Sequence, residues 1–123
     1  MKLVFLVYTN IVDHHFNGDT PLETMFWLHH PYSAAEISLI EGSKHIINQY
    51  LQIEAYTTPG LMLTPWSPTP ENLQLYVNGV PYWKQATAGI LLLTERDIIE
   101  IILTDNEKEI LTHQIIVITS ITK

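Results

Sequence analysis

The feature of this sequence that most constrains the fold is an Asn78-Gly79 pair between two apolar segments. Residues 73–77 and 80–83 flank the pair, and both are rich in residues typical of strands. Asn-Gly is favoured at the centre of a type I′ turn, which joins two antiparallel strands through a two-residue loop. The sequence therefore predicts a β-hairpin over residues 73–83.

Pro81 predicts that this hairpin lies at the edge of its sheet. With a two-residue loop, Pro81 lies opposite Tyr76 in a pair whose backbone groups point away from the hairpin. Proline has no amide hydrogen to donate, so a further strand cannot bond at this position. We therefore expect the strand that contains Pro81 to end the sheet.

Further strands are predicted on both sides of the hairpin. Residues 89–94, 98–104 and 110–122 are apolar, rich in β-branched side chains and separated by short polar turns. Residues 3–8 form a continuous apolar run, which is typical of a strand buried on both faces. Consecutive strands joined by short turns are typical of antiparallel sandwiches. The predicted fold class is mainly β, an antiparallel β-sandwich.

Residues 20–56 carry conflicting signals. Residues 20–23 (Thr-Pro-Leu-Glu) and 33–36 (Ser-Ala-Ala-Glu) both have the layout of a helix capping box. The apolar residues of the same region suit strands equally, and the alternation within residues 46–56 favours a strand. We expect one or two short helices in this N-terminal half.

The length of 123 residues suits a single β-rich domain over residues 1–123. Residues 57–72 interrupt the strand pattern with a proline-rich stretch. Pro65, Pro68 and Pro70 remove three amide donors there. We expect this segment to be extended and exposed, and either to connect two parts of the domain or to hold a neighbouring subunit.

The composition argues for protein partners. Charged residues make up 15% of the chain, against roughly 25% in an average globular protein, so some surface is expected to be buried against other subunits. Six basic residues stand against 13 acidic ones, which gives a net charge of −7. Nucleic acids and anionic lipids both require clustered Lys and Arg. We expect a homo-oligomer that binds neither nucleic acid nor membrane.

The absence of cysteine excludes disulfides and thiol chemistry. The apolar run near the N-terminus is too short for a signal peptide. No segment approaches the roughly 20 apolar residues of a transmembrane helix.

A resemblance to a known group of proteins covers residues 73–103. Residues 75–80 (Leu-Tyr-Val-Asn-Gly-Val), the apolar strand at 90–93 and residues 97–101 (Asp-Ile-Ile-Glu-Ile) resemble a recurring β-module of tailed-phage virion proteins. Arg96 stands where the phage pattern usually has glycine, so the turn before Asp97 is expected to differ. The resemblance implies a structural role in a phage head, collar, tail or fibre, and it carries no catalytic residues.

The predicted function is accordingly non-enzymatic. The chain is expected to be a capsid decoration (cement) protein, or a tail or collar component, that stabilises contacts between subunits. Its expected partners are further copies of itself and other virion proteins, and its expected location is the virion, assembled in the host cytoplasm. Catalytic signatures such as G-x-S-x-G and H-E-x-x-H are missing, and no cofactor is expected.

Aromatic residues supply the candidate interface. Trp66, flanked by Pro65 and Pro68, is expected to contact a partner, and Tyr82 and Trp83 follow the hairpin. Exposed aromatic side chains anchor protein interfaces and also stack on sugar rings. The position of Trp83 on a predicted strand favours the core instead. A carbohydrate- or receptor-binding module is therefore an alternative function.

Histidine pairs supply a second alternative, a small metal-dependent protein. Asp13, His14, His15, His29 and His30 are residue types that bind zinc and related ions. Adjacent residues on a strand face opposite sides, so each pair is expected to give one ligand. A three-ligand site with the aspartate is one interpretation, and ordinary loop histidines are the other.

Overall fold

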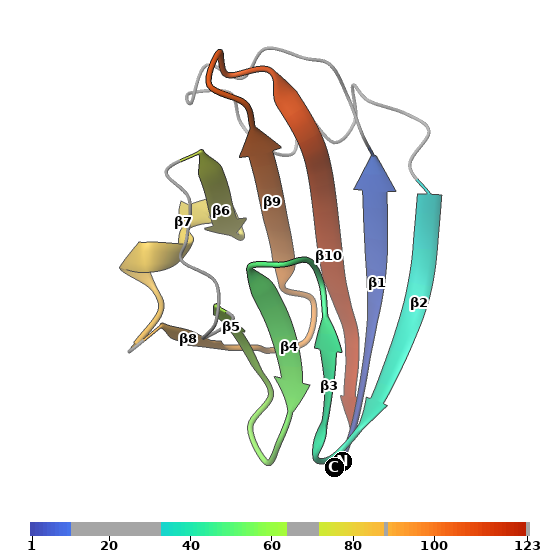
Figure 1. Cartoon of the computed structure of the whole chain (residues 1–123). Coiled ribbons are helices and arrows are strands. Elements are labelled where there is room, and N and C mark those ends of the chain that lie inside the picture. The colour runs from blue at the N-terminus through green and yellow to red at the C-terminus, as the bar shows by residue number, and fades with distance from the viewer. Residues whose placement is uncertain (11–32, 64–71, 88, 123) are drawn as a thin grey trace.

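The computed structural model describes residues 1–10, 33–63, 72–87 and 89–122, and every structural statement below concerns these ranges. They form two antiparallel sheets that face each other (Figure 1). The larger sheet has the strand order β2 (Ser33–Ile40), β1 (Lys2–Asn10), β10 (Ile110–Thr122), β9 (Ile98–Thr104), β6 (Leu73–Val77) and β7 (Val80–Pro81). The smaller sheet has the order β3 (Ser43–Ile46), β4 (Leu51–Ala55), β5 (Gly60–Leu63) and β8 (Ile90–Leu92).

The hydrophobic core lies between the two sheets. Strand alternation turns every second side chain of each sheet inward, and the inward side chains of both sheets form one cluster. The fully buried members include Leu3, Phe5, Ile99, Ile116 and Ile118 of the larger sheet and Leu51, Ile53 and Leu61 of the smaller one. The ring of Phe5 meets His45 of β3 edge to face, with 5.9 Å between ring centroids.

The two central strands of the larger sheet are buried on both faces. Ile101 belongs to the core cluster, whereas its neighbour Ile102 points to the opposite face and is also fully buried. Ile115 and Ile116 of β10 repeat this arrangement. The continuous β-branched runs of β9 and β10 therefore match the environment of strands with two apolar faces.

The predicted hairpin is confirmed. Val77 pairs with Val80, and the turn residues Asn78 and Gly79 have φ angles of 52° and 81°. The Asn78 side chain accepts a hydrogen bond of 2.9 Å from the Ile98 amide, which fixes the turn to β9. Because β7 ends the larger sheet in the described ranges, the edge position predicted from proline is also confirmed.

The prediction of a helix beginning at Ser33 is wrong. Residues 33–40 form β2, which pairs along its whole length with β1. A capping box contributes about 1 kcal/mol, whereas β2 pairs with β1 along its whole length and satisfies the backbone groups that face β1, so tertiary context overrides the local signal. The other predicted helix start, at residues 20–23, lies outside the described ranges. The helical element of the described ranges is the 3₁₀ turn η1 (Tyr82–Lys84).

Part of the predicted proline-rich connection belongs to the smaller sheet. Residues 60–63 form β5 between β4 and β8, and Gly60 and Leu61 are buried. The Cβ of any other residue at position 60 would meet the Ile90 side chain at 3.1 Å, so glycine permits the close approach of β8. Among the described residues there is no helix long and apolar enough to cross a membrane.

Candidate docking surface around Trp83

The segment between β7 and β8 connects the larger sheet to the smaller one, and it is held in place by several hydrogen bonds. The amides of Gln85 and Ala86 donate to the Tyr82 carbonyl at 3.0 and 2.9 Å, which closes the η1 turn. The Gln85 side chain donates to the carbonyls of Val77 and Val80 at 3.1 and 3.0 Å, which ties η1 back to the hairpin. These bonds fix the direction in which the η1 side chains point.

Tyr82 anchors this segment. Its side chain is 8% exposed and belongs to the core cluster, and its hydroxyl donates a hydrogen bond to the Gly89 carbonyl. Thr87 and Ile90 exchange two backbone hydrogen bonds of 3.0 Å next to it. Because burial removes water from the phenol, it raises the pKa of Tyr82 above the ordinary value of 10.0.

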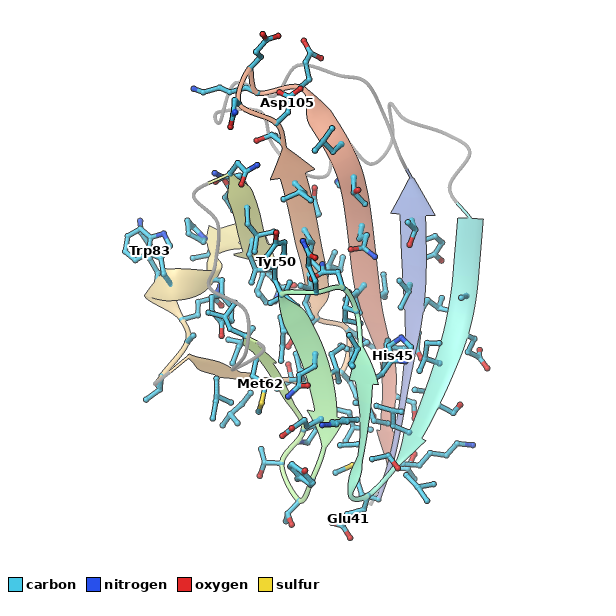
Figure 2. All side chains as sticks on the ribbon, viewed as in Figure 1. Glu41, His45, Tyr50, Met62, Trp83 and Asp105 are labelled. Atoms are coloured by element: carbon cyan, nitrogen blue, oxygen red, sulfur yellow. The ribbon has the colours of Figure 1, made fainter. Side chains whose placement is uncertain are left out.

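Trp83, the next residue, points away from the core. Its side chain is 74% exposed, and Figure 2 shows it at the outer side of the molecule. The Lys84 ammonium lies 5.2 Å from the centre of the indole ring, within cation–π range. The prediction that Trp83 belongs to the core is therefore wrong, because η1 replaces the expected strand and turns Tyr82 inward instead.

Trp83 borders a hollow of about 270 Å³ at the β6 end of the larger sheet. The lining is mainly apolar and aromatic, and it consists of Leu63, Leu73, Gln74, Leu75, Tyr76, Pro81, Tyr82 and Trp83. Strand β7 pairs only with Tyr76 and Val77, so the first three residues of β6 have no strand beside them on this side in the described ranges. The hollow follows that unpaired part of the edge.

Other exposed apolar side chains lie on the two strands that flank this segment. Val80, Ile90 and Leu92 are exposed on β7 and β8, and Leu92 reaches 59%. We call the exposed side chains of Val80, Trp83, Ile90 and Leu92 the Trp83 surface. Single exposed apolar residues are common, but four on three consecutive elements, one of them lining an apolar hollow, are typical of a protein contact.

We expect Tyr82→Phe to flatten the alkaline part of the stability profile. The raised pKa means that the folded state favours the neutral Tyr82 phenol over the ionised one. The resulting contribution to the free energy of unfolding is therefore complete below pH 10.0, and it is lost as the pH rises through the raised pKa. Urea unfolding between about pH 8 and pH 11 should therefore show a steeper loss of stability for the unmodified chain than for the variant. Parallel profiles would contradict this assignment.

The structure describes two of the five predicted interface residues. Tyr82 is buried in the core cluster next to the Trp83 surface, whereas the Trp83 side chain is exposed to solvent. Trp66, Pro65 and Pro68 lie outside the described ranges, and their interface role stays a prediction.

The predicted metal ligands Asp13, His14, His15, His29 and His30 also lie outside the described ranges. Within those ranges no group of three or more His, Asp or Glu side chains is arranged to hold a metal ion.

A buried Glu100–His113 pair is the polar feature that the sequence-based prediction missed. His113 Nε2 lies 2.9 Å from Glu100 Oε2, and the two side chains are 4% exposed or less. They occupy adjacent strands on the face of the larger sheet opposite the shared core. The sequence did contain a signal for this pair, because Glu100 and His113 are polar residues within mainly apolar strand segments. Both side chains are shielded from solvent, and the pair joins two neighbouring strands of the larger sheet.

A second hollow of about 280 Å³ opens between the sheets near the β3–β4 turn. Asn48 donates to Gln114 Oε1 at 3.2 Å beside it, and Asn48 Oδ1 accepts from the amides of Tyr50 and Leu51. These bonds shape the turn and close one end of the core.

Comparisons with protein-family models, with curated proteins and with solved structures returned no match for this chain.

Proposed function

We propose that this chain is a non-enzymatic β-sandwich protein that assembles into the particle of a tailed phage, as a capsid decoration protein or a tail or collar component. The Trp83 surface would contact a neighbouring virion protein. The observation that carries this proposal is the 74% exposure of a tryptophan on a turn held by side-chain and backbone hydrogen bonds. A rigid, exposed indole loses little conformational freedom on binding, and tryptophan is enriched among the residues that dominate protein interfaces.

The phage assignment itself is supported by the resemblance of residues 73–103 to virion β-modules. In the structure this segment comprises the hairpin, η1, β8 and most of β9. It therefore contains every residue of the Trp83 surface. Genes for head and tail proteins on both sides of the gene for this chain are expected, as is the chain itself in purified particles.

Trp83→Ala is expected to weaken attachment to particles about 30-fold, which corresponds to about 2 kcal/mol. The measurement is co-sedimentation of purified chain with particles that lack it. Leu111→Ala is the matched control, because Leu111 is also an exposed apolar residue but lies on β10. Equal attachment of the Trp83 variant and the unmodified chain would contradict the role of this surface, and absence of the chain from particles would contradict the phage assignment.

A carbohydrate-binding module is the second candidate, and one observation favours it. The exposed indole borders a hollow that also presents Gln74 and Tyr76, whose side chains are hydrogen-bonded to each other at 3.4 Å. An aromatic face beside polar groups suits a sugar ring. Glycan binding that is lost in the same Trp83→Ala variant, without any attachment to particles, would favour this function over assembly.

A further inference from the structure

Strand β2 forms the end of the larger sheet opposite to β7. It pairs with β1 on one side, and among the described strands none lies on its other side. Figure 1 shows this open edge at the right of the molecule. Residues 34–36, 38 and 40 are exposed, so the edge is accessible at these positions.

The backbone groups on the open side can be assigned from the β1–β2 ladder. The Glu41 amide donates to the Met1 carbonyl at 3.0 Å, which extends that ladder by one hydrogen-bonded pair. Bonded and non-bonded pairs alternate in antiparallel strands, so the odd-numbered residues of β2 bond to β1. The even-numbered residues therefore turn their amides and carbonyls outward, and these are Ala34, Glu36, Ser38 and Ile40.

The other three edges of the two described sheets carry features that hinder pairing with another chain, and β2 lacks them. Strand β7 has two residues and contains Pro81, β8 has three residues, and β3 has four residues and contains Lys44. Short length, proline and lysine are the usual protections of an edge. Strand β2 has eight residues without proline or lysine, and its register with β1 has no bulge. Its single charge is Glu36.

We propose that β2 pairs antiparallel with β2 of a second copy about a two-fold axis. This contact would join the two six-stranded sheets into one of twelve strands. A two-fold contact uses the same surface on both copies, and an edge strand that is complementary to itself meets this requirement. The proposal does not depend on the phage assignment, because it concerns how the chain binds itself.

The outward groups and the side-chain alternation select one register. Bonded pairs must join even-numbered residues, and the arrangement that uses the whole strand sets Ala34 opposite Ile40 and Glu36 opposite Ser38. Ile37 then faces Ile37 of the second copy in a non-bonded pair. A slip by two residues in one direction sets the two Glu36 carboxylates opposite each other, which is unfavourable. A slip in the other direction leaves Ala34 unpaired.

The same register extends the hydrophobic core across the joint. Ile37 and Leu39 point to the core side of β2, Leu39 is buried, and Ile37 is half-buried against the core cluster. Pairing would bring Ile37 against its counterpart and complete its burial. Because β2 and β7 lie at opposite ends of the sheet, the dimer would carry one Trp83 surface at each outer end.

Substitution Ser38→Pro tests the backbone contact. The Ser38 amide points away from β1, so proline removes no bond within the monomer, but by symmetry it removes two bonds from the dimer. Sedimentation equilibrium should show self-association weakened about 30-fold or more. Ser38→Thr keeps the amide and is the matched control. A monomeric unmodified chain, or equal dimerisation of the proline variant, would overturn the proposal.

Cysteine cross-linking tests the register and does not depend on the proline variant folding. The chain has no cysteine of its own, so a single substitution reports one site. Ile37→Cys places two thiols in a non-bonded pair, where Cα atoms lie about 4.5 Å apart, within reach of a disulfide. In Ile40→Cys the two thiols are six residues apart along the joint, or about 20 Å. Mild oxidation should link the Ile37 variant and leave the more exposed Ile40 variant unlinked, and the reverse result would overturn the register.

Discussion

Replacement of His113 by alanine is expected to lower the free energy of unfolding by about 3–5 kcal/mol. His113 is fully buried, and its Nε2 atom lies 2.9 Å from a carboxylate oxygen of Glu100, which is 3% exposed. Removal of the imidazole leaves that carboxylate in a water-free environment without its histidine partner. The loss of a hydrogen-bond partner by a buried carboxylate is costly because less of its lost hydration is compensated. Urea unfolding at neutral pH measures the change.

The double variant Glu100→Leu/His113→Leu separates two costs. One is the cost of removing a single partner while the other stays buried, and the second is the cost of removing both partners together. When both polar groups are replaced by apolar ones of similar size, the desolvation penalty disappears together with the interaction. The double variant should therefore be more stable than the sum of the two single leucine variants predicts. Additive effects of the two single substitutions would show that the side chains do not stabilise each other.

Phe5→Ala is the second substitution with a large expected effect, again about 3–5 kcal/mol. Phe5 is fully buried in the shared core and packs edge to face against His45 of the opposite sheet. The truncation removes apolar contact area and leaves a cavity between two sheets whose backbones are held by their own ladders. Such sites collapse only partly, so most of the lost packing is not recovered.

The controls for Phe5→Ala vary volume and position separately. Phe5→Leu retains much of the volume and should cost clearly less than the alanine variant. Leu111→Ala removes an exposed side chain and should change the free energy of unfolding by less than about 0.5 kcal/mol. A small effect of Phe5→Ala, comparable with that of Leu111→Ala, would contradict the placement of Phe5 in the core.

The second half of the chain could largely be predicted because its signals are local. The Asn78-Gly79 turn requires positive φ angles that few other residue pairs adopt, and the structure has them. The polar turns between the last strands set the limits of β9 and β10, which coincide with the predicted ranges 98–104 and 110–122. In each case the residues that decide the element lie within it or next to it.

The candidate docking surface was predicted only in part. Tyr82 and Trp83 were both identified as interface residues, but their opposite orientations follow from η1, which the sequence pattern did not indicate. The turn depends on bonds from Gln85 to Val77 and Val80, and these partners are brought together by the hairpin. Side-chain direction in such a turn is therefore a result of several contacts, not of periodicity.

The open edge at β2 was also missed, because the Ser33-Ala34-Ala35-Glu36 segment favours a helix by itself. Alanine and glutamate have high helix propensity, and the capping layout adds to it. Strand β1 offers a full ladder of backbone hydrogen bonds to this segment, and Leu39 gains a place in the core only as part of a strand. Backbone pairing and burial together outweigh a propensity difference of a few tenths of a kcal/mol per residue.

The sequence by itself determined that this chain is mainly β and that its hairpin turns at Asn78-Gly79. It also determined that the strand containing Pro81 lies at the edge of its sheet. Turn preferences and the alternation of side chains depend on residues that are close in the sequence, so they do not require contacts made by folding. Only the tertiary structure decided that residues 33–40 are a strand, that Glu100 meets His113 and that Trp83 faces solvent while Tyr82 does not. These outcomes depend on contacts between segments far apart in the sequence, and such contacts form only when the two sheets close around their core.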